Sequence, residues 1–105
     1  MKLLTKELEH KLPALGSQDE VTDPMVHVKF FNPMGSWQWF AIEYDPETRT
    51  FFGFVHGFED ELGYFTLTEL EGIMVEFGLG IERDRYWAPR PLSEVKDAIA
   101  KYGRA

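Results

Sequence analysis

The fold of this chain is decided by residues 23–70, which read DPMVHVKFFNPMGSWQWFAIEYDPETRTFFGFVHGFEDELGYFTLTEL. Twelve of the sixteen aromatic residues lie here, between short turn sequences rich in Gly, Pro and Asn. Apolar side chains that alternate along such segments indicate β-strands. The stretch predicts strands over residues 25–31, 36–44, 50–56 and 63–67. Because every connection is short, an antiparallel meander is the simplest arrangement.

Outside this stretch the apolar residues follow a helical period. The spacing predicts helices near residues 5–12, 68–77 and 93–102. Thr68 with Glu71 forms an apparent capping box for the second helix, and Ser93 is the expected cap of the third. The predicted fold class is α+β, with a single antiparallel four-stranded meander sheet packed by about three short helices.

The apolar pattern also predicts individual core positions. Phe40 on the second strand and Phe77 on the second helix are expected to point inward, as is Tyr102 on the third helix. On the second strand Trp37, Trp39 and Glu43 are expected to share one face.

Length and composition indicate one domain over residues 1–105. Its expected parts are an N-terminal helix and polar loop (1–22), a sheet (23–67), and helices with a C-terminal segment (68–105). Cysteine is absent, which excludes disulfides and thiolate chemistry. No stretch approaches the roughly 20 apolar residues of a membrane helix. We therefore expect a cytoplasmic protein without membrane contact.

The net charge of −7 is concentrated in residues 51–80, which carry no Lys or Arg. The acids of this region define a predicted acidic face: Glu59, Asp60, Glu61, Glu69, Glu71 and Glu76. Phosphate contacts need clustered basic residues, so direct binding of nucleic acid is disfavoured. Two interpretations of the acidic face remain open, namely simple solvation and docking of a basic or nucleic-acid-binding protein.

The second and third predicted strands are apolar on both faces, unlike strands of a one-sided sheet. Either other elements cover both faces, or one face carries an exposed aromatic patch. Trp37 and Trp39 define this predicted aromatic face, which could serve as a binding surface.

Catalytic signals are weak. Glu43, His56 and Glu59 form the best available carboxylate–imidazole group. Asp45 is better explained as the first residue of a turn. Nucleophile elbow, phosphate loop and zinc-ligand spacing are all missing from the sequence. A non-enzymatic protein is therefore favoured over an enzyme, and no metal or cofactor is expected.

Several segments together resemble one known family. They are the opening LLTKEL…LP, the runs VKFF, SWQWFAIEYDPET, FFGFV and ELGYFTLTEL, and the later IERDRYW…PLSEV. The set resembles the bacterial and phage family catalogued as domain of unknown function family 2958, over nearly the whole chain. The resemblance implies a small single-domain protein of the kind carried by plasmids, phages and integrated elements. It implies no activity and no catalytic residues.

Three hypotheses follow. The first is a non-enzymatic interaction or accessory protein of mobile-element origin, whose sharp form is an acidic DNA mimic that inhibits a host restriction or CRISPR nuclease. The second is a small enzyme that uses Glu43, His56 and Glu59. The third is a ligand-binding domain that uses the Trp37 and Trp39 face.

Overall fold

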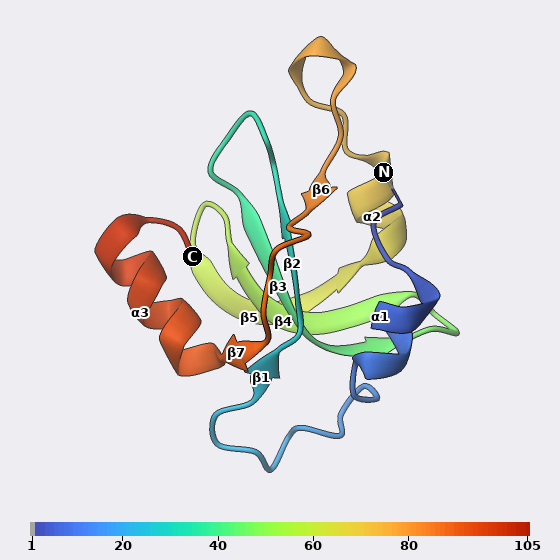
Figure 1. The fold of residues 1–105 in the computed structure, drawn as a ribbon, viewed down its shortest axis with the longest axis vertical. Helices are drawn as coiled ribbons and strands as arrows, with labels where there is room; N and C mark the ends of the chain where they lie inside the picture. The colour runs from blue at the N-terminus through green and yellow to red at the C-terminus, as the bar shows by residue number, and fades with distance from the viewer. Residues whose placement is uncertain (1) are drawn as a thin grey trace.

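A computed structural model describes residues 2–105, apart from the side chain of Glu76. Figure 1 shows the arrangement of the elements. The helices are α1 (Lys6–Lys11), α2 (Leu67–Gly72), the short 3-10 turn η1 (Glu76–Gly78) and α3 (Leu92–Tyr102). The strands are β1 (Met25–Val26), β2 (Val28–Phe31), β3 (Gln38–Asp45), β4 (Thr50–His56), β5 (Asp60–Thr66), β6 (Glu82–Arg83) and β7 (Arg90–Pro91). In this part of the chain no helix is long and apolar enough to cross a membrane.

The main sheet has five strands in the order β5-β4-β3-β2-β6, and every neighbouring pair is antiparallel. The α+β class and the antiparallel meander are thus confirmed. The prediction of a single four-stranded sheet is wrong, because β6 adds a fifth strand and β1 pairs with β7 in a separate small sheet. Strands of two residues are too short to show an alternating pattern in the sequence.

Each face of the sheet carries a hydrophobic core. The core on the first face combines sheet residues with the N-terminal segment and α2: Leu3, Leu4, Leu12, Val28, Phe30, Trp39, Ala41, Tyr44, Phe51, Phe65, Leu67, Leu70 and Ile81. The core on the second face combines other sheet residues with residues of β1 and α3: Val26, Phe40, Ile42, Phe54, Leu92, Val95 and Ile99. Figure 1 shows α3 on one side of the sheet and α1 with α2 on the other.

A β-bulge in β3 corrects the predicted faces of that strand. The pairing with β4 shifts between Ala41 and Glu43. An extra residue in one strand reverses the alternation beyond it. Tyr44 therefore packs in the first core, while Glu43 lies on the second face, where it lines a hollow with Ile42. The expectation that Glu43 shares a face with Trp37 and Trp39 is wrong, because a bulge leaves no mark in the apolar pattern.

The second helix is shorter than predicted. Its cap lies two residues earlier than predicted, because the capping box is made by Thr66 and Glu69 rather than by Thr68 and Glu71. It ends at Gly72, a residue that weakens helices. The chain then forms a narrow loop in which Met74 pairs with Gly80.

This loop overturns the core assignment of Phe77. The residue has a φ of 63° and its side chain is 85% exposed. Figure 1 shows the loop before β6 standing away from the body of the protein. A helix through residue 77 would have turned the ring inward, and the early end at Gly72 removes that geometry.

The third helix forms where predicted and ends at Tyr102 as expected, but its start and its cap differ. Pro91 occupies the cap position, and Ser93 instead binds Asp23 through its backbone N–H and hydroxyl (2.8 and 2.6 Å). These two bonds lower the pKa of Asp23. Tyr102 in the last turn is exposed, contrary to its predicted inward position.

Candidate functional site

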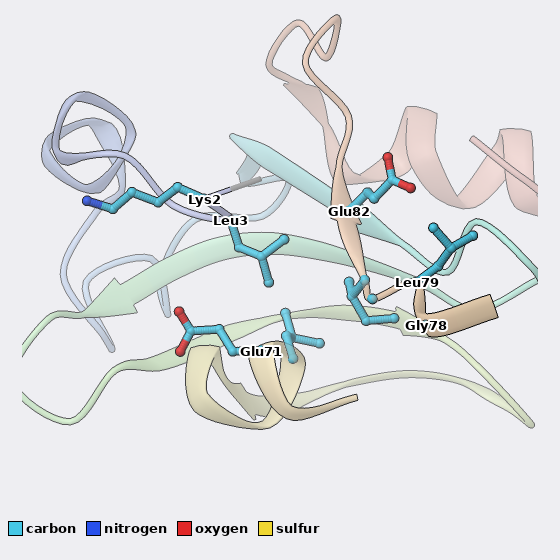
Figure 2. A pocket seen from close by; sticks show the side chains of 9 residues that line it. Lys2, Leu3, Glu71, Gly78, Leu79 and Glu82 are labelled. Atoms are coloured by element: carbon cyan, nitrogen blue, oxygen red, sulfur yellow. The ribbon is translucent and has the colours of Figure 1, made fainter. Parts of the chain in front are cut away.

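A hollow of about 550 Å³ lies between the N-terminal segment, α2 and the chain leading into β6. Figure 2 shows that the charged ends of Lys2, Glu71 and Glu82 point in different directions rather than toward one another. Glu71 is also held by Arg49, whose guanidinium lies 2.9 Å from the carboxylate. The hollow is large enough to hold a small molecule. Its charged groups do not point toward one common position, so they would not orient a ligand there.

A smaller hollow on the first face of the sheet combines aromatic and acidic groups. We call it the aromatic–acidic pocket; it measures about 230 Å³ and is lined by Trp37, Val55, Gly57, Phe58, Glu59 and Glu61. These residues come from the position just before β3, the end of β4, the β4–β5 turn and the start of β5. Small-molecule sites usually measure about 300–1,000 Å³, so this volume suits a single side chain.

The sequence builds the aromatic wall through a glycine. A Cβ at position 57 would lie 2.6 Å from the indole of Trp37, so only glycine lets that ring lie against the turn. The ring of Phe58 then meets Trp37 edge-on, with centroids 5.1 Å apart and planes at 85°. Trp39 supports Trp37 from behind at 5.7 Å and is itself buried. The wall is thus fixed on its inner side and open outward.

The outer part of the wall is unusually exposed. Trp37 is half-buried, whereas Phe58 is 94% exposed. Glu59 and Glu61 are exposed beside it, and neither carboxylate has a hydrogen bond or ion pair to any other residue from 2 to 105. Aromatic faces and carboxylates both attract cations. The arrangement can therefore receive a lysine or arginine side chain.

The predicted carboxylate–imidazole group is not assembled. His56 pairs with Asp60, its Nδ1 lying 2.5 Å from a carboxylate oxygen, and not with Glu59. His56 pairs with Gln38 across the sheet, and Glu43 lies five residues further along β3. At about 3.3 Å per residue, roughly 15 Å of strand separates them. The three residues cannot act on one substrate atom.

Glu43 has a structural place instead. Its side chain is 2% exposed, and its two carboxylate oxygens accept hydrogen bonds from the backbone N–H groups of Gly16 and Gln18, both at 2.8 Å. Backbone donors to a buried carboxylate satisfy its charge. Glu43 thus fastens the loop between α1 and β1 to the second face of the sheet.

This role gives a testable prediction. Glu43→Gln keeps the shape of the side chain but leaves one oxygen as acceptor, so we expect a loss of about 1–3 kcal/mol in the free energy of unfolding. Urea denaturation measures it, and amide exchange at Gly16 and Gln18 should accelerate. Glu47→Gln, on the exposed β3–β4 turn, is the control and should change little. Equal stability of both variants would show that Glu43 does not hold the loop.

The predicted acidic face is divided by β5. Glu59, Asp60 and Glu61 lie at the start of this strand, whereas Glu69 and Glu71 follow its end, about 20 Å away at roughly 3.3 Å per residue. Glu69 is used in the capping box, and Glu71 raises the pKa of Arg49 by hydrogen bonding to it. The side chain of Glu76 lies outside the described part of the chain.

Sequence reasoning missed the pocket although most of its parts were singled out. The sequence places Trp37 on the predicted aromatic face, and Glu59 and Glu61 on the predicted acidic face. The structure brings these two sets together through Gly57 and Phe58, which lie between the predicted strands over residues 50–56 and 63–67. An aromatic residue between a glycine and an acidic run was the available signal, because turns seldom need a phenylalanine.

Comparisons with known proteins support the family resemblance. The family described as "Protein of unknown function (DUF2958)" matches residues 3–104. No curated protein and no solved structure matches the chain. Among residues 2–105, excluding the side chain of Glu76, no group of three or more His, Asp or Glu side chains is placed to hold a metal ion.

Proposed function

This chain belongs to the DUF2958 family, and we propose from its structure that it is a non-enzymatic interaction protein that binds a basic protein partner. The aromatic–acidic pocket is the proposed docking site. It would receive a lysine or arginine side chain of the partner between the Trp37–Phe58 wall and the carboxylates of Glu59 and Glu61.

One observation carries this proposal: Phe58, which is 94% exposed and touches Trp37 edge-on, stands beside two carboxylates that have no hydrogen bond or ion pair within the described residues 2–105. Exposing a large aromatic ring to water is unfavourable, and exposed apolar groups at polar rims are typical of interaction sites. Aromatic residues often supply most of the binding free energy at interfaces. A cation placed on the ring would gain attraction from both the aromatic face and the acids.

The charge of the whole molecule supports a basic partner. A net charge of −7 attracts positively charged proteins over long distances and speeds their association. The stretch from residue 51 to residue 80 contributes six acids and no Lys or Arg. This field favours positively charged partners before any contact forms.

The sharper form of the proposal is an inhibitor of a host defence nuclease, from a mobile genetic element. Its support is the negative charge, since nucleases carry basic DNA-binding surfaces. Imitation of DNA would require a long row of available carboxylates. The division of the acids by β5, and the engagement of Glu69 and Glu71, favour docking at the aromatic–acidic pocket over an extended charged row.

A short peptide with alternating arginine and valine residues provides a direct test. We expect Phe58→Ala to weaken its binding about tenfold or more, and Glu59→Gln with Glu61→Gln to do the same. Glu47→Gln, an exposed acid outside the pocket, is the control. Binding should also weaken as salt rises, because exposed charges are screened over about 10 Å at 0.1 M.

The same comparison can contradict the proposal. If the peptide binds the wild type and all these variants with equal affinity, the pocket is not the docking site. If binding is lost only when valine is replaced, and does not depend on arginine or on salt, then the partner is not recognised by its charge.

A further inference from the structure

We propose that the basic partner binds as an extended segment that adds a sixth strand to the outer edge of β5. This inference rests on the proposed function and specifies the form of the partner. Addition of a strand supplies affinity through backbone hydrogen bonds, and alternating side-chain positions supply specificity. The segment would lie beside Leu62 and Tyr64, next to the aromatic–acidic pocket.

The pairing of β4 with β5 shows which backbone groups point outward. At one end of the ladder the N–H of Leu67 donates to the carbonyl of Arg49 (2.9 Å), and at the other the N–H of Gly57 donates to that of Glu59 (3.2 Å). The register is unbroken between them. In an antiparallel ladder such bonded pairs alternate with non-bonded pairs. The odd-numbered residues of β5 therefore bond to β4, and Leu62 and Tyr64 direct their N–H and C=O groups outward.

The outer edge of β5 is open over a defined length. No strand in residues 2–105 pairs with it. At its far end the outward N–H of Thr66 is already used, since it donates to the carboxylate of Glu69 in the capping box (3.2 Å). The open part therefore runs from Asp60 to Tyr64.

Natural sheet edges are usually protected by charged side chains, lysine above all, or by proline, a bulge or a covering element. Residues 60–66 contain no lysine or proline, and their pairing with β4 has no bulge. Leu62 is 46% exposed and Tyr64 71% exposed, both on the second face of the sheet. A side chain at Gly63 would meet nothing within 4 Å. The charged residues of this edge, Asp60 and Glu61, are both acidic, so they disfavour pairing with an acidic strand but not with a basic one.

The side chains beside this edge specify the occupant. In an antiparallel addition, residues opposite Leu62 and Tyr64 would place their side chains on the second face, over apolar surface. The residue opposite Glu61 would place its side chain on the first face, beside that carboxylate and the aromatic–acidic pocket. The matching segment alternates apolar with lysine or arginine residues. A second copy of this chain fits less well, because each copy carries a net charge of −7 and the same acids.

A pair of variants at Leu62 distinguishes the contribution of the backbone N–H to peptide binding from the contribution of the side chain. Leu62→Ala keeps the outward N–H, whereas Leu62→Pro removes it without removing a bond to β4. With the alternating valine–arginine peptide as probe, we expect Leu62→Pro to weaken binding at least about tenfold and Leu62→Ala to weaken it less than about threefold. Equal effects of the two variants would contradict strand addition.

Peptides with N-methyl groups test the same point on the unchanged protein. Valines opposite Leu62 and Tyr64 would direct their N–H groups toward β5, and arginines would direct theirs away. N-methylation of the valines should abolish binding, while N-methylation of the arginines should preserve it. Binding of both methylated peptides would overturn the inference, as would a dimer of the protein in analytical ultracentrifugation that Leu62→Pro abolishes. If Phe58→Ala weakens binding while Leu62→Pro does not, the result would support docking at the aromatic–acidic pocket and contradict the addition of a strand to β5.

Discussion

Replacement of Phe40 by alanine is expected to lower the free energy of unfolding by about 3–5 kcal/mol. The side chain is 0% exposed and forms part of the second core. Its ring lies between those of Phe54 and Trp87, with centroid distances of 6.2 and 5.7 Å. Removing it would leave a cavity between the sheet and α3. Native stability is only about 5–15 kcal/mol, so urea denaturation should show a large shift of the midpoint.

Phe77→Ala is the matched control, because it deletes the same ring from an exposed position. Surface substitutions usually change stability by less than about 0.5 kcal/mol. Equal losses in the two variants would contradict the placement of Phe77 outside the core, and negligible losses in both would contradict the placement of Phe40 within it.

Gly53→Ala is expected to be at least as damaging. A Cβ at this position would lie 1.9 Å from the carbonyl oxygen of Phe40 and 2.9 Å from its carbonyl carbon. Both are backbone atoms of the neighbouring strand, so no side-chain rotation can relieve the overlap. We expect a loss of about 3 kcal/mol or more, measured by urea denaturation, or failure to fold.

The control lies directly across the ladder. Gly63 pairs with Gly53, yet a Cβ at Gly63 would meet nothing within 4 Å. Gly63→Ala should leave stability unchanged or raise it by about 0.4–1 kcal/mol, because alanine restricts the unfolded chain more than glycine does. If the two alanine variants had the same stability, this would contradict the close contact between the backbones of β3 and β4 at Gly53.

The sequence predicts the long strands well because they are rich in aromatic and β-branched residues and are bounded by clear turn sequences. β3, β4 and their turns form close to where the pattern places them. β5 begins earlier than predicted, since acidic residues 60 and 61 look like turn residues. An exposed edge strand needs no apolar alternation, and its first residues therefore carry no strand signal.

Other features depend on contacts that no local pattern records. The bulge near Ala41 reverses the face of Glu43, and it is set by pairing with β4. The helix expected through residue 77 ends at Gly72, although Ile73, Met74 and Phe77 keep a helical spacing. Helical period without packing partners does not hold a helix together in water.

The candidate site was predictable in parts and not as a whole. The tryptophan face and the acidic face were both identified, but as separate surfaces. They meet because the β4–β5 turn brings Phe58 and Glu59 back over Trp37, a contact between segments about twenty residues apart. Long-range contacts of this kind follow from the register of the sheet, which the sequence alone does not give.

The most direct test of the proposed docking site is an NMR titration of the isotope-labelled protein with the alternating valine–arginine peptide. We expect the indole N–H signal of Trp37 and the ring signals of Phe58 to shift as the peptide binds. The indole N–H of Trp87, which donates to the carbonyl of Val26 on the other side of the sheet (3.1 Å), should remain in place. Binding of the peptide with no change at Trp37 or Phe58 would contradict the account.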